Sequence, residues 1–304
     1  MILLGLISLL AFSLAQATDA THDPATLLQR LDALITQDTA DDSLDDLTNL
    51  RNAALDAGPS ALPLLRPLLP TASQSVRYRV AYALAFTGQT EIVDPLVAEF
   101  KRTKDLSIKA MACFASARRG TDADVRFLIK ALKGEQFGDE WPPIEVAALS
   151  LGVLRDRSAI APLQVAAKKT PGSISGGAAA EALSWIRKGT FNVPATSVGD
   201  DLLPVLAVMR HGVPRILESP AYFESDAHRV WRRTGRKWSL QPSQNNIEGS
   251  PTISFTTVVS ADRKRAVVSV GLLFGPLNGV GFDYLLSDRG GSWSVIGILP
   301  TWIS

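Results

Sequence analysis

The clearest sign of the fold of this chain is the stretch Val76-Arg77-Tyr78-Arg79-Val80-Ala81-Tyr82-Ala83-Leu84, which ends at Gly88. Its small and apolar side chains recur at intervals of three and four residues, so they fall on one face of a helix. Small side chains on such a face let a neighbouring helix approach closely. The positions that share the face are Val76, Val80, Ala83, Leu84 and Thr87.

The same pattern returns along the chain. Two further copies run over residues 108–120 and 144–156, and weaker copies begin at Leu47 and Ser175. The five starts are spaced by 29, 32, 36 and 31 residues. A repeat period of roughly 20–50 residues is typical of a solenoid, in which each unit packs on its neighbours. We therefore expect about five stacked helix pairs over residues 24–189.

A second set of helices is predicted between these copies, over residues 60–69, 91–101, 122–132 and 158–168. Three of the four contain a proline close to the first turn, where a helix tolerates the missing N–H group. These prolines are Pro63, Pro95 and Pro162.

Together these motifs resemble HEAT repeats, especially the short kind first associated with phycobilisome lyases. In that family the first helix of a pair carries a proline, the turn carries an aspartate, and Val-Arg opens the second helix. Val76-Arg77 matches this opening, and Ile108-Lys109 follows it with Asp105 in the preceding turn. The resemblance implies an α-solenoid whose second helices line a concave face that usually binds a partner.

Arg77 and Lys109 are therefore candidate binding residues, one repeat apart near the face that the resemblance implies. The alternative is a structural role, because in the family the arginine at this position more often pairs with turn aspartates. Asp105 near Lys109 favours that alternative. Exposed pairs of this kind contribute about 0–1 kcal/mol each to stability.

The longest repeat interval is explained by an inserted loop over residues 133–143, which contains Phe137 and Trp141 among acidic residues. Insertions in solenoids map to loops on one edge and often touch the ligand. Trp141 is thus the third candidate binding residue. The alternative is that its ring folds back onto the adjacent helices.

The N-terminal segment differs in kind from the rest. Residues 1–14 are almost wholly apolar, and Ala15-Gln16-Ala17 supplies the small residues of a signal-peptidase site. An apolar core of this length suits a cleavable secretory signal rather than a spanning helix, which needs about 20 residues. We expect residues 1–17 to be a signal peptide, export to the periplasm or exterior, and no membrane span after cleavage. An uncleaved anchor stays the alternative, because no basic residue precedes the apolar core.

The C-terminal part has a different texture. Residues 190–199 read as a linker, and residues 200–304 as a helix to about His211 followed by six strands with short turns. Short connections favour antiparallel pairing. The predicted fold class is therefore α+β, a helical solenoid followed by an antiparallel-sheet domain. The ending Tyr284-Leu285-Leu286 … Gly291-Ser292-Trp293 resembles the nuclear-transport-factor-like cone fold, which would contain a cavity.

No pattern for catalysis, metal or cofactor binding stands out. The three histidines have no carboxylate or cysteine at ligand spacing, the single cysteine excludes an intramolecular disulfide, and phosphate-loop and nucleophile-elbow motifs are absent from the sequence. Residues 73–194 hold 17 basic and 12 acidic side chains, net +5, an excess that lacks a recognised nucleic-acid-binding module. We expect no cofactor and no nucleic-acid partner.

The leading hypothesis is an exported, non-catalytic scaffold whose helical repeats bind a protein or peptide partner. The alternative is a small-molecule-binding or enzymatic C-terminal cone domain, with the helices as an accessory. Its first polar groups to consider are His211, His228, Asp283 and Tyr284, because a binding pocket needs polar groups that converge among apolar walls.

Overall fold

The computed structural model of the 304-residue chain describes most of the sequence. The described residues are 23–36, 43–134, 141–171, 173–189, 203–212, 229–234, 237–242, 252–275 and 278–303. The predicted signal peptide, its cleavage site after Ala17 and the predicted linker 190–199 lie outside these ranges.

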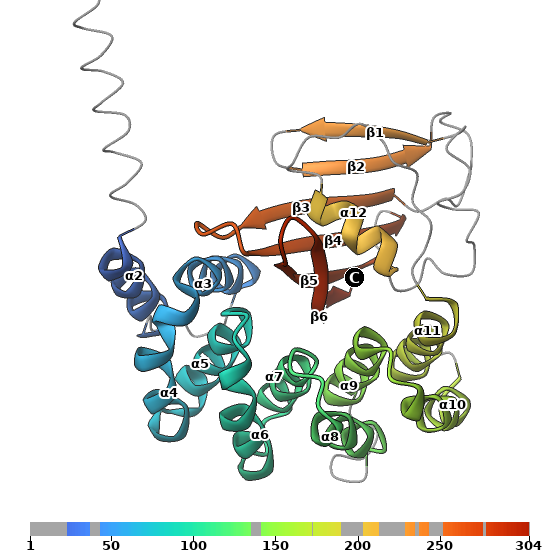
Figure 1. Ribbon diagram of the computed structural model, residues 1–304, viewed down its shortest axis with the longest axis horizontal. Helices are drawn as coiled ribbons and strands as arrows, with labels where there is room; N and C mark the ends of the chain where they lie inside the picture. The colour runs from blue at the N-terminus through green and yellow to red at the C-terminus, as the bar shows by residue number, and fades with distance from the viewer. Residues whose placement is uncertain are drawn as a thin grey trace, which may run out of the picture.

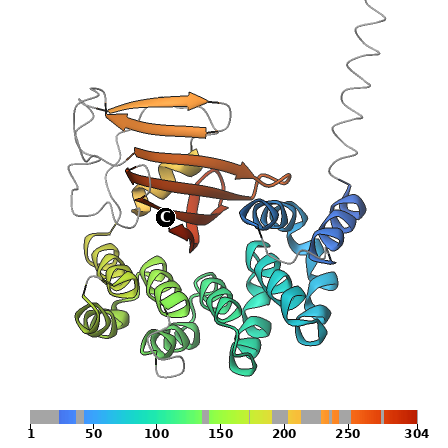
Figure 2. The ribbon, with the colours of Figure 1, turned by 180° about the vertical axis from the view of Figure 1, so that it is seen from behind.

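The first half of the chain forms paired helices that stack into an arc of two layers (Figure 1). The inner layer faces the C-terminal sheet, and the outer layer lies on the far side (Figure 2). The inner helices are α3 (Leu44–Ala57), α5 (Gln74–Phe86), α7 (Leu106–Ser116), α9 (Trp141–Leu154) and α11 (Ile174–Lys188). The outer helices are α4 (Leu62–Thr71), α6 (Val93–Arg102), α8 (Asp122–Leu132) and α10 (Ile160–Lys169), and α2 (Pro24–Thr36) begins the arc.

Side-chain caps fix where the helices begin. Asp105 accepts hydrogen bonds from the backbone N–H groups of Ser107 and Ile108, at 2.9 and 3.2 Å, and so caps α7. Thr121 and Asp124 form a reciprocal capping box at the start of α8. Gly88 and Gly120 follow α5 and α7 with positive φ angles of 75° and 62°, which a glycine adopts without a steric penalty.

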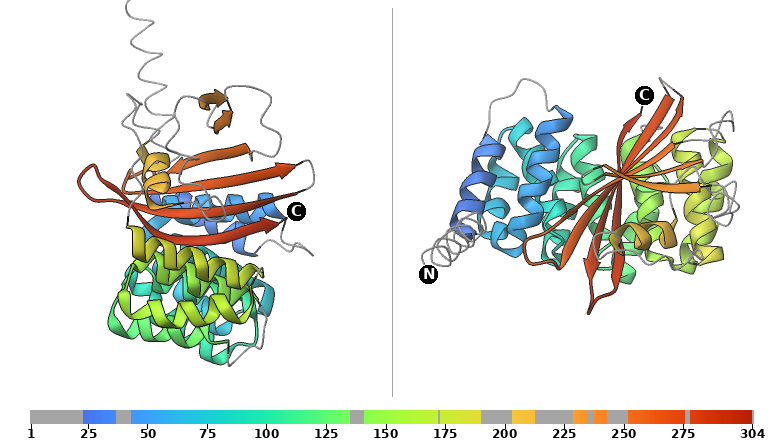
Figure 3. Two further views of the ribbon diagram at one scale, coloured as in Figure 1. Left: turned by 90° about the vertical axis from the view of Figure 1, so that its right-hand side faces the viewer. Right: turned by 90° about the horizontal axis from the view of Figure 1, so that it is seen from above.

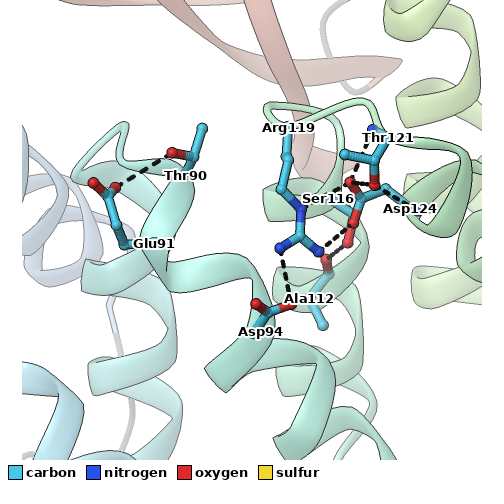
Figure 4. Close-up of polar contacts among 8 residues, drawn as sticks. All are labelled: Thr90, Glu91, Asp94, Ala112, Ser116, Arg119, Thr121 and Asp124. Atoms are coloured by element: carbon cyan, nitrogen blue, oxygen red, sulfur yellow. Dashed lines mark hydrogen bonds and ion pairs between the residues drawn. The ribbon is translucent and has the colours of Figure 1, made fainter.

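Neighbouring helix pairs are tied by an arginine in a turn (Figure 4). Arg119 follows α7 and donates to Asp94 of α6 at 2.9 Å. It also donates through two nitrogens to Asp124 of α8, at 2.9 and 2.7 Å. The Asp124 side chain is buried, and the guanidinium holds the pKa of its carboxyl below the ordinary value against the opposing effect of burial. This fork fixes the relative position of two successive pairs.

The second half of the chain forms one six-stranded antiparallel sheet in simple sequence order. A short helix, α12 (Leu203–His211), precedes it. The strands are β1 (Arg229–Thr234), β2 (Lys237–Pro242), β3 (Thr252–Val259), β4 (Arg265–Gly275), β5 (Asn278–Asp288) and β6 (Trp293–Ile303).

The sheet stands over the inner layer of helices, with its edge strand β6 nearest to them (Figures 1 and 3). β6 contacts α7 and α9 and is also covered by α12. Phe114 of α7 lies against Gly297 of β6, where an added β-carbon would be only 2.6 Å from the ring. Covering an edge strand in this way removes a site at which another chain could pair. Buried apolar side chains of helices and sheet form one continuous core.

The expected α+β arrangement of helices followed by an antiparallel sheet is confirmed. Two local expectations were wrong. Trp141 does not belong to the inserted loop but is the first residue of α9. Two prolines follow it in the first turn, where proline is tolerated. The last strand, expected over residues 293–299, runs on to Ile303, and it contacts α7, α9 and α12, which the local sequence does not indicate.

Candidate ligand-binding cavity

A cavity of about 410 Å³ lies between the inner helices and the sheet. Four helices and three strands contribute to its wall. The lining residues are Leu47, Thr48 and Arg51 of α3, Tyr78 and Tyr82 of α5, Ser107, Ala110 and Met111 of α7, Pro142, Glu145 and Val146 of α9, Ser269 of β4, Asp283 of β5, and Leu299, Pro300 and Thr301 of β6.

Each inner helix supplies this wall from one side. The lining positions on α5 are Tyr78 and Tyr82, four residues apart, and those on α7 include Ser107 and Met111, also four apart. Residues at this spacing lie above one another on a helix. The cavity therefore runs across the stacked helices, along the inner face of the arc.

The sheet supplies the opposite wall through a row of cross-strand neighbours. Ser269 stands opposite Asp283 in the β4–β5 pair, and Asp283 stands opposite Leu299 in the β5–β6 pair. Directly paired residues of an antiparallel sheet point to the same face. One face of the sheet thus presents a hydroxyl, a carboxylate and an apolar side chain side by side.

A buried ion pair joins the two walls. Arg51 of α3 contacts Asp283 of β5, and the side chains of both are about 95% buried, at 5% and 4% exposure. Ser269 completes the group: its hydroxyl donates to Asp283 at 2.7 Å and accepts from Arg51 at 3.0 Å. Asn52 accepts two more hydrogen bonds from Arg51, both at 3.1 Å. The charges are therefore paired inside the protein, as a dry site requires.

Tyr82 lies next to this group. Its ring is buried between Tyr78 and Phe86, at centroid distances of 6.0 and 5.0 Å. Burial, and secondly the charge of Asp283, raise the pKa of the Tyr82 hydroxyl well above its ordinary value. Among the described residues this hydroxyl has no hydrogen-bond partner. It stays protonated at physiological pH and can donate a hydrogen bond.

The cavity has the general character of a small-molecule site. Such pockets are commonly about 300–1,000 Å³ and mostly apolar, with a few convergent polar groups. Here the apolar share of the wall comes chiefly from Leu47, Met111, Val146, Leu299 and Pro300. The arrangement offers shape, apolar surface and hydrogen bonds, which are the requirements of binding.

The three residues predicted to bind lie elsewhere. Arg77 donates to the backbone carbonyl of Ala72 at 2.8 Å and lies 3.6 Å from the carboxylate of Glu99 on α6. The Lys109 ammonium lies over the ring of Phe100, also on α6, at 5.3 Å. Neither residue lines the cavity. The side chain of Trp141 lies outside the described part of the structure.

The four polar residues considered for a C-terminal site do not converge. Asp283 lines the cavity, but Tyr284 follows it in the strand and so points to the other face. There its hydroxyl donates to the carbonyl of Gly212 at 3.0 Å. His211 is buried edge-on against Trp185, with ring centroids 4.9 Å apart. His228 lies outside the described residues.

Apart from Asp283, sequence reasoning missed the residues that shape the cavity, although a signal existed for one of them. Arg51 lies one turn after Leu47 and next to Leu50, so it sits on the apolar side of its helix. A charge in such a stripe indicates a buried partner. Nothing local marks Ser269 or Tyr82, because their roles depend on where the sheet stands.

No group of three His, Cys, Asp or Glu side chains in the described part of the chain is placed to hold a metal ion. Comparison with models of known protein families finds no match to this chain, and comparison with curated protein sequences finds none. The cavity must therefore be interpreted from its own chemistry.

Proposed function

We propose that this protein is a non-catalytic binding protein whose ligand occupies the cavity between the helical arc and the sheet. The observation that carries the proposal is the junction itself: two walls from distant parts of the chain enclose about 410 Å³ beside a buried, internally paired polar group. The surface of the wall is mainly apolar, and its charged groups Arg51 and Asp283 are already paired with each other, which suits binding rather than bond-breaking chemistry.

We further propose that the arc is a HEAT-type solenoid. Support comes from the paired helices in two layers and from the Arg119 fork that links successive pairs. In this reading the inner face that HEAT proteins usually offer to a partner is covered by the chain's own sheet. The relation of that sheet to the cone fold is a weaker proposal, supported by a short helix followed by consecutive antiparallel strands.

Export is also proposed, on the sequence of residues 1–17 alone. No helix in the described part of the chain has both the length and the apolar character needed to cross a bilayer. Mass spectrometry of the mature protein from an expressing bacterium tests the proposal, because cleavage after Ala17 gives an N-terminus at Thr18. An intact Met1 on cell-retained protein would contradict it.

A protein or peptide partner is the second candidate, and a groove on the outer layer favours it. This groove of about 330 Å³ lies between α4 and α6, with Arg66 and Arg102 beside Leu69 and Pro95. Arg102 is already paired with Glu99 of the same groove, so Arg66 is the cation that suits an acidic segment. If the candidate is right, the R66E protein loses a partner that the wild type captures from an envelope extract.

The binding proposal is tested by filling the cavity. A fragment library is screened by ligand-observed NMR against the wild type and against Ala110→Leu, which places extra side-chain volume in the wall. Ala161→Leu is the matched control, because Ala161 is exposed on α10, away from the cavity. Fragments should bind the wild type and the control and be lost from A110L.

A second variant, Ser107→Trp, keeps the test valid if Ala110→Leu fails to fold. Ser107 lines the cavity but is exposed at its rim, so Ser107→Trp blocks the opening without entering the core. Fragments that bind both filled variants as well as the wild type would show that this cavity is not the binding site.

A further inference from the structure

The charge balance of the cavity restricts what it can bind. The only guanidinium among the lining residues belongs to Arg51, and its nitrogens already donate to Asp283, Ser269 and Asn52. An anionic ligand would have to lose its hydration and compete with Asp283 for this cation, in a region that also holds the carboxylate of Glu145. Burying an uncompensated charge is costly, so the site disfavours anions.

The Tyr82 hydroxyl is a polar group of the wall that a ligand can reach. The Tyr82 side chain lines the cavity at 5% exposure, and its hydroxyl makes no hydrogen bond among the described residues. A ligand oxygen that accepts from this hydroxyl would keep it hydrogen-bonded when the ligand displaces water from the cavity. Ser269 and Asp283, by contrast, already satisfy each other.

We infer that the ligand is an uncharged, predominantly apolar small molecule with a carbonyl or similar oxygen that accepts a hydrogen bond from Tyr82. This inference rests on the proposed binding function and names the class of ligand. The apolar body would lie against Leu47, Met111 and Leu299, and the acceptor would lie beside the Arg51–Asp283 pair. The proposed binding function alone would not require the cavity to prefer uncharged ligands over anions.

Two dyes of similar size make the test concrete. Nile red is uncharged, carries a carbonyl oxygen, and emits at shorter wavelength in apolar surroundings. Anilinonaphthalene sulfonate is comparably apolar but anionic. Each is titrated into the folded wild-type protein while fluorescence is followed. We expect saturable, single-site Nile red binding, and binding of the sulfonate at least tenfold weaker.

Tyr82→Phe tests the hydrogen bond. This change removes only the hydroxyl, and it should weaken Nile red binding by about five- to tenfold, as expected for one lost hydrogen bond. The blue shift should remain, because the apolar wall is unchanged. Circular dichroism and the melting temperature establish that the variant is folded.

Val165→Ser controls for dye that adsorbs to exposed apolar surface, since Val165 is 67% exposed on α10. This variant should bind Nile red as the wild type does. Ala110→Leu should lose the single site.

The outcomes separate the two proposals. Equal affinity of wild type and Y82F for Nile red, or equal affinity for both dyes, overturns the ligand class while the binding function stands. Saturable Nile red binding that survives in both A110L and S107W overturns the cavity as the site, and the proposed function with it.

Discussion

Arg51 and Asp283, 232 residues apart in sequence, form a buried ion pair that joins helix α3 to strand β5. The contact links the N-terminal part of the helical arc, at α3, to β5, which lies between β4 and β6 in the sheet. It lies in the wall of the proposed ligand cavity. Stability of the helix–sheet junction and the shape of the site therefore depend on the same pair.

Removing one member of this pair should be more damaging than removing both. Arg51→Met leaves the Asp283 carboxylate buried without its cation, which typically costs about 3–5 kcal/mol. Replacing both, as R51M/D283L, removes the stranded charge and should recover a large part of that loss. Urea unfolding of the single and double variants measures the difference. A double variant no more stable than R51M would contradict the role of the ion pair.

A second junction depends on a glycine. Gly58 ends α3 with φ +52°, and a β-carbon there would overlap the guanidinium of Arg265 from the β3–β4 hairpin. Arg265 itself donates to the carbonyl of Thr87 at 2.9 Å. Gly58→Ala should therefore destabilise the protein by more than the roughly 1–3 kcal/mol expected from backbone strain alone. Thermal unfolding provides the measurement.

Gly291→Ala is the matched control for this effect. Gly291 also has a positive φ, of 86°, but nothing lies within 4 Å of its added β-carbon. It should show the strain without the clash. If the two variants melt at the same temperature, the contact between Arg265 and Gly58 does not constrain the junction.

Arg118 should be replaceable with a gain in stability. Its three nitrogens are inaccessible and hydrogen-bond to no described residue, burial lowers its pKa to about 9, and the ring of Phe114 at 5.2 Å gives partial compensation. The corresponding repeat positions hold Phe86 and Leu154, which are apolar. We expect Arg118→Met to stabilise the fold by about 1–3 kcal/mol.

The neighbouring arginine supplies the comparison. Arg119→Met removes the fork to Asp94 and Asp124 and strands a buried carboxylate, so it should destabilise. Chemical denaturation of both variants would show opposite signs. Loss of stability in R118M would mean that the Arg118 charge has a compensating interaction.

Acid should destabilise the protein partly through His211. Burial, and secondly the charge of Arg155, lower the pKa of His211 to about 3. The unfolded chain takes up this proton below about pH 6.5, whereas the folded protein does not until about pH 3. Stability from this group is thus complete above pH 6.5 and declines as the pH falls through that range.

His211→Phe keeps an aromatic ring against Trp185 and removes the titration. Urea unfolding at pH 7 and pH 5 should show that the wild type loses about 2 kcal/mol more than the variant between these values. Carboxylates titrate equally in both proteins and cancel in the comparison. Identical losses would place the His211 pKa near its ordinary value.

The sequence alone determined the local structure. Apolar residues at intervals of three and four predicted the inner helices, because this spacing is set by the geometry of one helix. Turn residues between short segments rich in strand-forming residues predicted the six strands. Asp105 was expected to pair with Lys109, and the structure shows it instead as the N-cap of α7. The start of α9 was predicted wrongly, because Trp141 follows a loop and precedes two prolines, a pattern that fits both a loop and a helix start.

Only the tertiary structure decided where the cavity lies. Its walls come from α3, α5, α7 and α9 on one side and β4, β5 and β6 on the other, and no sequence period relates Arg51 to Asp283. The predicted residues Arg77 and Lys109 contact α6 instead, because the charged end of each side chain lies toward the outer helix. Contacts between distant segments depend on how whole helices and strands pack. That packing depends on many side chains at once, so no local pattern in the sequence reveals it.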